Sequence, residues 1–152
     1  MQLFSEMLND MLVTVFHNIM RVEEEFLQKN HRVNLSIREM HMLEYVGKAY
    51  NEGRTLSEIA DWLKVARPTV TIAARKLEEK GYLVKNGCVR DGRVVRVTLT
   101  REGRKVYRNH MRFHMLMVRE LEDCFCGDEK ELLIRALEKL DGFFDKSIGA
   151  AV

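Results

Sequence analysis

The stretch RPTVTIAARKLEEKGYLVK, residues 67–85, decides the fold because it combines a helix, a helix stop and the start of a strand. Val70, Ala74 and Leu77 recur at helical spacing and form one apolar stripe that a core can bury. The Lys-Gly pair at 80–81 is a typical helix end, with a cation near the last carbonyl groups and then a glycine. The pattern predicts an amphipathic helix followed by a β-strand.

The opposite face of this predicted helix is small, polar and cationic. Arg67, Thr71 and Arg75 share one side of it. Such a face is what major-groove reading requires of a helix, whereas the alternative is an ordinary solvated surface helix. The candidate DNA-contacting residues on the helix are Arg67, Pro68, Thr69, Thr71, Ile72, Arg75 and Lys76.

The segment before this helix favours the DNA-reading interpretation. Thr55 and Glu58 have the spacing of a capping box, which opens a short helix, LSEIADWL. Residues 64–66 separate that helix from the one beginning near residue 67. A short helix, a brief turn and a longer basic helix are the layout of a helix-turn-helix, in which the second helix enters the groove.

Two β-rich runs, at 82–85 and 94–100, follow the predicted recognition helix and bracket a turn rich in glycine and charge. This pattern predicts a β-hairpin, and its position makes the hairpin a wing. We expect Arg90 and Arg93 at its tip to reach a minor groove or phosphates, and Asp91 to orient an arginine. A solvated loop is the alternative.

Composition limits the class of protein. The 152 residues are 46% hydrophobic and 32% charged, with one proline, which indicates a folded, mostly helical domain. The sequence has no apolar run of membrane-spanning length and begins without a basic signal-peptide head, so we expect a cytoplasmic protein with no membrane partner. Cys88, Cys124 and Cys126 favour structural thiols over a disulfide framework or a zinc site.

The charge distribution is uneven. Residues 64–105 hold twelve Lys and Arg and four acids, a net charge of +8. Since the whole chain carries +2, the remainder carries −6. A basic middle between acidic ends indicates a polyanionic partner.

The flanking segments predict further helices with apolar stripes. Residues 5–30 carry a near-heptad seam, and Glu23-Glu24-Glu25 is interpreted as a solvated face. Ser36 with Glu39, and Asp128 with Glu131, have capping-box spacing, and Thr100 can cap a helix over 101–124. The seam residues are Leu8, Leu12, Val15, Ile19, Val22 and Phe26.

We therefore expect a mostly α fold with a small β-hairpin wing, a winged helix-turn-helix flanked by N- and C-terminal dimerisation helices. Residues 1–152 form a single domain, with a DNA-binding lobe at 36–100 and dimerisation helices at 1–30 and 101–148. The apolar stripes of the flanking helices exceed what the DNA-binding lobe needs for its own core. We expect them to be buried in an isologous interface between two copies of the chain, which gives a homodimer. Two recognition helices would then lie about one DNA turn, ~34 Å, apart on a pseudo-palindromic operator.

Two segments resemble the MarR family of winged-helix regulators: TLSEIADWLKVARPTVTIAARKLEEKGYLVK (55–85) and RDGRVVRVTLTREG (90–103). Leu99, Thr100 and Gly103 match the Leu-Thr-x-x-Gly end of that family's wing signature. The family commonly has an arginine where this chain has Gly92, so the departure implies either weaker wing contacts or contacts led by Arg90 and Arg93.

A narrower resemblance is to the FabT-type branch of that family. It is carried by VEEEFL (22–27), SIREMHMLEYVGKA (36–49) and HMRFHMLMV (110–118). This resemblance implies a repressor of type II fatty-acid biosynthesis genes, with acyl-acyl carrier protein as co-repressor. It also implies a ligand pocket between the dimerisation helices and the DNA-binding lobe.

The candidate pocket residues are Met40, His41, His110, Phe113, His114 and Met117. His110 and His114 share a helix face, which could bind a metal, but hydrogen-bonded histidines at a helix interface are the favoured interpretation, so no metal or other cofactor is expected. The methionines suit either an acyl chain or plain core packing. The sequence contains no nucleophile–base pair or phosphate loop, which argues against an enzyme.

Two alternatives remain open. The first is a MarR-type regulator that responds to a small aromatic ligand or a metal. The second is a winged-helix protein-interaction module, which would need an exposed apolar patch in place of the cationic face.

Overall fold

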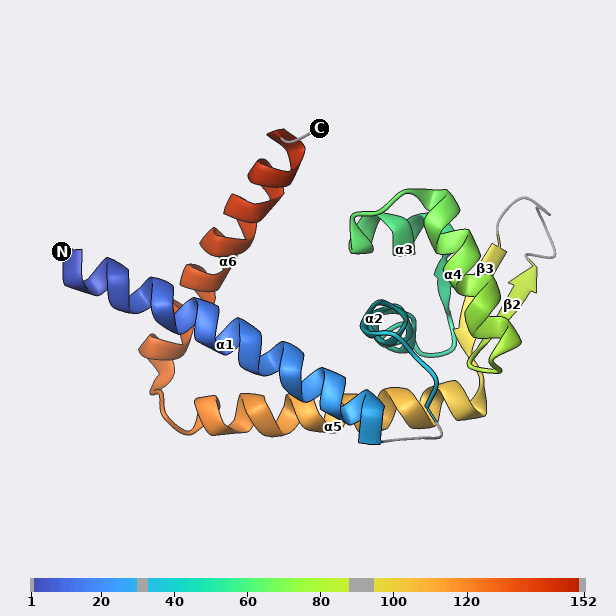
Figure 1. Ribbon diagram of the computed structural model, residues 1–152, viewed down its shortest axis with the longest axis horizontal. Coiled ribbons are helices and arrows are strands. Elements are labelled where there is room, and N and C mark those ends of the chain that lie inside the picture. The colour runs from blue at the N-terminus through green and yellow to red at the C-terminus, as the bar shows by residue number, and fades with distance from the viewer. Residues whose placement is uncertain (1, 30–32, 88–94, 151–152) are drawn as a thin grey trace. The chain divides into compact units, whose positions relative to one another are not determined.

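A computed structural model describes residues 2–29, 33–87 and 95–150. It divides into two compact units, residues 1–111 and 112–152, with the boundary inside the fifth helix. In chain order the elements are α1 (Gln2–Lys29), α2 (Ile37–Gly47), β1 (Arg54–Thr55), α3 (Leu56–Leu63), α4 (Arg67–Glu79), β2 (Leu83–Gly87), β3 (Val95–Leu99), α5 (Arg101–Glu122) and α6 (Gly127–Ala150) (Figure 1).

Helices α3 and α4 form the predicted helix-turn-helix. The capping box that opens α3 is present: the Thr55 hydroxyl accepts from the Glu58 N–H at 3.1 Å, and the Glu58 carboxylate accepts from the Thr55 N–H at 2.7 Å. Lys64 then adopts the left-handed conformation, with φ 53°, which turns the chain out of α3. Pro68 lies in the first turn of α4, as its missing N–H allows.

The end of α4 is fixed by its own backbone. The Tyr82 N–H donates to the Leu77 carbonyl and the Gly81 N–H to the Glu78 carbonyl, both at 2.9 Å. This pair of bonds is a Schellman motif, and it needs a residue in the left-handed region at Gly81, where φ is 80°. Glycine adopts that conformation without steric cost, so the predicted helix stop is confirmed.

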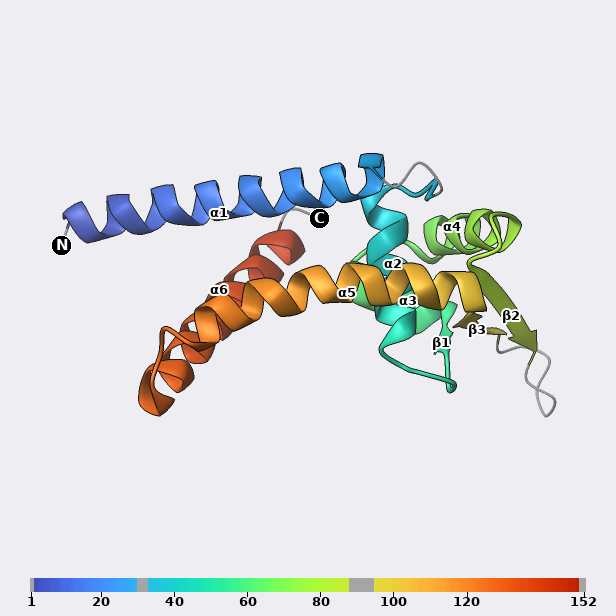
Figure 2. The ribbon, with the colours of Figure 1, turned by 90° about the horizontal axis from the view of Figure 1, so that it is seen from below.

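The wing is a three-stranded antiparallel sheet in the order β1-β3-β2, and its hairpin strands run side by side (Figure 2). Leu83 pairs with Leu99 and Gly87 with Val95, which confirms the predicted hairpin. No sequence pattern predicted β1, where Arg54 pairs with Val97. A two-residue strand is too short to show the alternation of apolar and polar residues that identifies a strand in a sequence. Its extended conformation is recognised only from its pairing with β3.

One junction joins the end of α4, both wing strands and the start of α5. The Thr100 N–H donates to the Tyr82 carbonyl at 3.0 Å. The Thr100 hydroxyl donates to the Gly81 carbonyl at 2.6 Å and accepts from the Gly103 N–H at 3.0 Å, which confirms that Thr100 caps α5. A Cβ at Gly103 would overlap the Tyr82 carbonyl, so the helix can approach this closely only with glycine there.

The core lies in the first unit, between α2, α3, α4 and the sheet. The apolar stripe of α4 is buried as predicted, and α2 contributes buried side chains from one broad face. At Gly47 a Cβ would come within 2.8 Å of the Tyr107 ring, so α2 and α5 also pack closely. The fully buried core residues include Met40, Met42, Leu43, Val46, Ile59, Val70, Ala74, Leu77, Leu83 and Val97.

The N-terminus of α2 is tied to the C-terminus of α4. Ser36 and Glu39 form the predicted capping box, and the Lys80 ammonium lies 2.9 Å from both Glu39 carboxylate oxygens. Burial opposes ionisation of Glu39, but hydrogen bonds from Lys80 and Ser36 outweigh it and hold the pKa of the carboxyl below its usual value. This contact fixes the end of α4 against the core.

The third predicted capping box is wrong. Helix α6 begins at Gly127, and the carboxylate that reaches back is that of Glu129, which accepts from the Cys126 N–H at 2.9 Å. Asp128 therefore lies inside the first turn instead of capping it. Cysteine is an unusual residue at a helix N-cap. The capping-box spacing of Asp128 and Glu131 was therefore a stronger sequence signal than Cys126.

None of the described helices combines the length and the apolar character needed to cross a membrane.

We predict that Gly103→Ala destabilises the protein by about 2–3 kcal/mol, because the added methyl group must displace the Tyr82 backbone. Denaturant unfolding at fixed protein concentration measures the effect. Gly127→Ala is the matched control, since a Cβ there meets none of the described atoms within 4 Å. Equal stability of the two variants would contradict the role assigned to this junction.

Candidate nucleic-acid interface and histidine cluster

The outer face of α4 is fully presented to solvent. Val70, Ala74 and Leu77 face the core with at most 1% of their surfaces exposed, so the opposite side of the helix must point outward. All seven residues predicted to contact DNA from this helix are exposed: Arg67, Pro68, Thr69, Thr71, Ile72, Arg75 and Lys76. The helix therefore offers cations, hydroxyl groups and one aliphatic side chain on a single face.

The individual side chains on this face suit base and phosphate contacts. The Thr71 hydroxyl donates to the Arg67 carbonyl at 3.0 Å, which orients it along the helix. The Arg75 Nε lies 3.6 Å from the Glu79 carboxylate, and both side chains remain about two-thirds exposed. Ile72 is 51% exposed, and an apolar group in this position can contact a thymine methyl.

The base of the wing is tied to α4. The Lys85 ammonium lies 2.9 Å from the Glu78 carboxylate, and this hydrogen bond lowers the pKa of the Glu78 carboxyl from its usual value. On the neighbouring strand the Arg96 guanidinium lies 3.9 Å from Glu58 of α3. The wing and the helix-turn-helix are thus connected by ion pairs on two sides. The predicted wing-tip residues Arg90, Asp91 and Arg93 lie outside the described residues.

The six predicted pocket residues fall into two groups. Met40 lies in the core of the first unit, and His41 and His110 contact the same carboxylate there. Phe113, His114 and Met117 belong to the second unit, where they are half-buried along α5. In that unit the Phe113 and His114 rings lie 5.1 Å apart, centroid to centroid.

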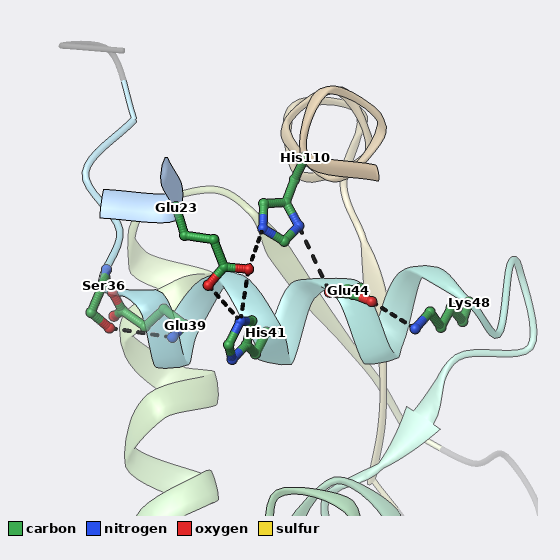
Figure 3. Close-up of polar contacts among 7 residues, drawn as sticks. All are labelled: Glu23, Ser36, Glu39, His41, Glu44, Lys48 and His110. Carbon is green, nitrogen blue, oxygen red and sulfur yellow. Dashed lines mark hydrogen bonds and ion pairs between the residues drawn. The ribbon is translucent and has the colours of Figure 1, made fainter. Parts of the chain in front are cut away.

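The carboxylate shared by the two histidines is that of Glu23, which corrects the interpretation of Glu23-Glu24-Glu25 as a solvated face. Glu23 is only 4% exposed, whereas Glu24 and Glu25 are exposed. Its Oε2 lies 3.2 Å from His41 Nε2, and its Oε1 lies 3.4 Å from His110 Nε2 (Figure 3). Helical spacing from Ile19 and Phe26 puts Glu23 on the seam side of α1, a signal that the run of three glutamates obscured.

A second carboxylate faces the other side of His110. The Glu44 carboxylate lies 3.7 Å from His110 Nδ1 and accepts a 2.6 Å hydrogen bond from Lys48 (Figure 3). His110 is 1% exposed, so a buried imidazole lies between two acidic groups. Side chains from α1, α2 and α5 therefore meet in one polar cluster within the first unit. No sequence pattern predicted a role for Glu44.

Comparison with known proteins identifies the family. The family model of the transcriptional regulators SarA/Rot matches residues 25–109, more than half of the chain. Comparison with the curated proteins gives no match.

Solved structures share the fold over nearly the whole chain. Streptococcus pneumoniae FabT in complex with DNA has 33% sequence identity and a TM-score of 0.81, covering 93% of this chain and 97% of that chain. A MarR protein from Peptoclostridium difficile has 25% sequence identity and a TM-score of 0.68, and the match covers 90% of this chain and 88% of that chain.

S. aureus MepR, in its complex with DNA, has the same fold. It has 24% sequence identity and a TM-score of 0.65, and the match covers 86% of this chain and 96% of that chain. The chain therefore belongs to the winged-helix, DNA-binding transcriptional regulators of the MarR and SarA/Rot type, as the sequence resemblance predicted.

Proposed function

We propose that the protein is a homodimeric repressor that reads a pseudo-palindromic operator through α4 and the wing. The observation that carries this proposal is the exposed cationic face of α4, which lies opposite a completely buried apolar stripe. A rigid helix with arginine and threonine side chains on its outer face can enter the major groove and hydrogen-bond to base edges. The basic segment around it supplies phosphate contacts.

The exposed apolar side chains of the outer helices support pairing. A single chain leaves many large apolar groups of α1 and α6 in water, more than a monomeric protein usually tolerates. A two-fold symmetric dimer buries the same residues from both chains at once. The most exposed of these residues are Leu3, Phe4, Met7, Met11 and Phe16 on α1, and Leu132, Ile134, Phe143 and Phe144 on α6.

A protein-interaction module fits the winged helix less well. Such a module would need a continuous apolar patch on the outer face of α4, and the large apolar residue there is Ile72, among charged and hydroxyl side chains. Charge and hydroxyl groups favour a polyanion over an apolar protein surface.

We further propose that the regulated genes are those of type II fatty-acid biosynthesis, with acyl-acyl carrier protein as the co-repressor. The support is the sequence resemblance to the FabT-type branch, together with 33% identity to FabT over most of both chains. A repressor of this kind acts where the chromosome and the carrier protein are, in the cytoplasm.

We predict that Arg75→Ala weakens binding to the preferred duplex by about 1–3 kcal/mol, because it removes a bidentate contact to a base edge. The duplex is first selected from a random pool with the wild-type protein, and binding is then measured by fluorescence anisotropy at matched salt. Arg135→Ala is the control, since it removes the same charge from an exposed position on α6. Unchanged affinity of Arg75→Ala would count against a base contact by this residue.

We predict that long-chain acyl-acyl carrier protein tightens binding to the selected duplex at least about tenfold, which is roughly 1.4 kcal/mol of coupling between the two sites. The holo carrier protein without an acyl chain is the control, because it has the same acidic surface. If neither the acylated nor the holo carrier protein changes the affinity for the duplex, the co-repressor proposal is wrong. DNA binding by α4 is tested separately, by the affinity of Arg75→Ala.

A further inference from the structure

We propose that the outward face of α5 in the first unit is the surface on which the acidic carrier protein docks. This surface, the α5 cationic face, consists of Arg101, Lys105 and Arg108, with Arg104 and Tyr50 at its edge. The inference rests on the proposed function, because it names the place where the proposed co-repressor binds.

The α5 cationic face follows from helical spacing. Arg101, Lys105 and Arg108 are four and three residues apart, so they lie on one side of the helix, and all three are exposed. Val106 and His110 are buried on the opposite side, where α5 packs on the core. The three cations therefore point into solvent together.

The charges of this face have no counterpart on the chain itself. Among the described residues, no carboxylate forms an ion pair with Arg101, Lys105 or Arg108, whereas the ammonium groups of Lys80 and Lys85 each lie 2.9 Å from one. Three like charges on one face repel each other and raise the local positive potential. A negatively charged partner would relieve this repulsion, and the potential would speed its approach.

A groove among these side chains suits the carboxylates of a protein better than a phosphate backbone. The groove has a volume of about 410 Å³ and is open to solvent. A partner carboxylate that enters it can accept charge-assisted hydrogen bonds from more than one cation. Glu102 and Asn109 lie in the same lining and would repel or fail to neutralise a continuous row of phosphates, whereas a protein surface can offer a hydrogen-bond donor there.

The loop after α2 adds an aromatic side chain at the edge of this face. The Arg104 guanidinium donates to the Asn51 side-chain oxygen at 3.5 Å, which ties the loop to α5. Tyr50 in this loop is 75% exposed and has a φ of 50°, a left-handed conformation that a bulky residue rarely adopts. Residues held in such conformations gather at binding sites, and tyrosine and arginine are frequent at the centres of protein interfaces.

The α5 cationic face is separate from the DNA-reading face. Helix α2 lies between α3 and the part of α5 that belongs to the first unit (Figure 1). A carrier protein on α5 and a duplex on α4 would thus occupy different sides of this unit. Both can be bound at once, as a co-repressor requires.

The predicted pocket residue His110 lies across the helix from the α5 cationic face. It is 1% exposed and faces the core, whereas Arg108 faces solvent. A helix with its side chains is about 10–12 Å in diameter. The flexible prosthetic arm of a docked carrier protein would therefore have to pass only one helix width to bring its acyl chain to the pocket side.

The test measures binding of a fluorescently labelled carrier protein that bears a hexadecanoyl chain to the full-length protein, without DNA. We expect Lys105→Glu and Arg108→Glu each to weaken binding about three- to tenfold, and the double variant at least about tenfold, because repulsion replaces attraction. Stopped-flow kinetics should show the loss mainly in the association rate. Arg135→Glu is the matched control, since it reverses the same charge at an exposed position on α6.

The outcomes separate this docking surface from the co-repressor proposal. If the wild type binds the acylated carrier protein and the folded double variant binds it as tightly as Arg135→Glu does, the docking surface is wrong and the co-repressor proposal stands. If the wild type does not bind it at all, both are wrong. Circular dichroism verifies that each variant is folded.

A second measurement distinguishes a carrier protein from nucleic acid on the same face. Arg108 lies outside the basic segment 64–105, so Arg108→Glu should change the affinity for the selected duplex by less than about twofold at matched salt, since exposed charges remote from a duplex are screened. A loss of duplex affinity as large as the loss of carrier-protein affinity would assign this face to DNA and overturn the proposal.

Discussion

The fold depends on the close contact between the backbone of Tyr82 and the residues that open α5. Thr100 bonds to the carbonyls of both Gly81 and Tyr82, and Gly103 lets the helix approach to a distance that no side chain permits. At this one point the end of α4, the wing strands and the start of α5 are held together. Both strands of the wing hairpin therefore start from a fixed base, and the Leu-Thr-x-x-Gly signature has a steric reason.

This junction helps to fix the proposed DNA-reading face of α4 in the protein without DNA. The Schellman motif ends α4, and Lys80 and Lys85 tie that end to α2 and to the wing base through Glu39 and Glu78. Because these contacts already hold the end of α4, DNA binding through this helix would lose less conformational entropy there. The arginine and threonine side chains on the outer face remain exposed to solvent, as the proposed contacts to base edges require.

The sequence predicted the features that local chemistry determines. Capping boxes, the proline at the start of α4 and the glycine at its end act within a few residues, so their pattern located the helix-turn-helix. The two β-rich runs around a turn rich in glycine and charge located the wing in the same local way. Features that depend on tertiary contacts were missed. Strand β1 exists only because β3 pairs with it, and Glu23 is buried because histidines from two other helices meet it. The α6 cap was misplaced because Cys126 is a weak signal beside the acidic residues.

The central claim is that the basic segment around α4 binds the phosphate backbone of duplex DNA. The salt dependence of binding to a random-sequence duplex tests it most directly, because the slope of log affinity against log salt counts the phosphates neutralised. The account predicts a steep fall, about 10³-fold between roughly 50 and 200 mM salt if about six phosphates are contacted. An affinity that stays constant over that range would contradict it.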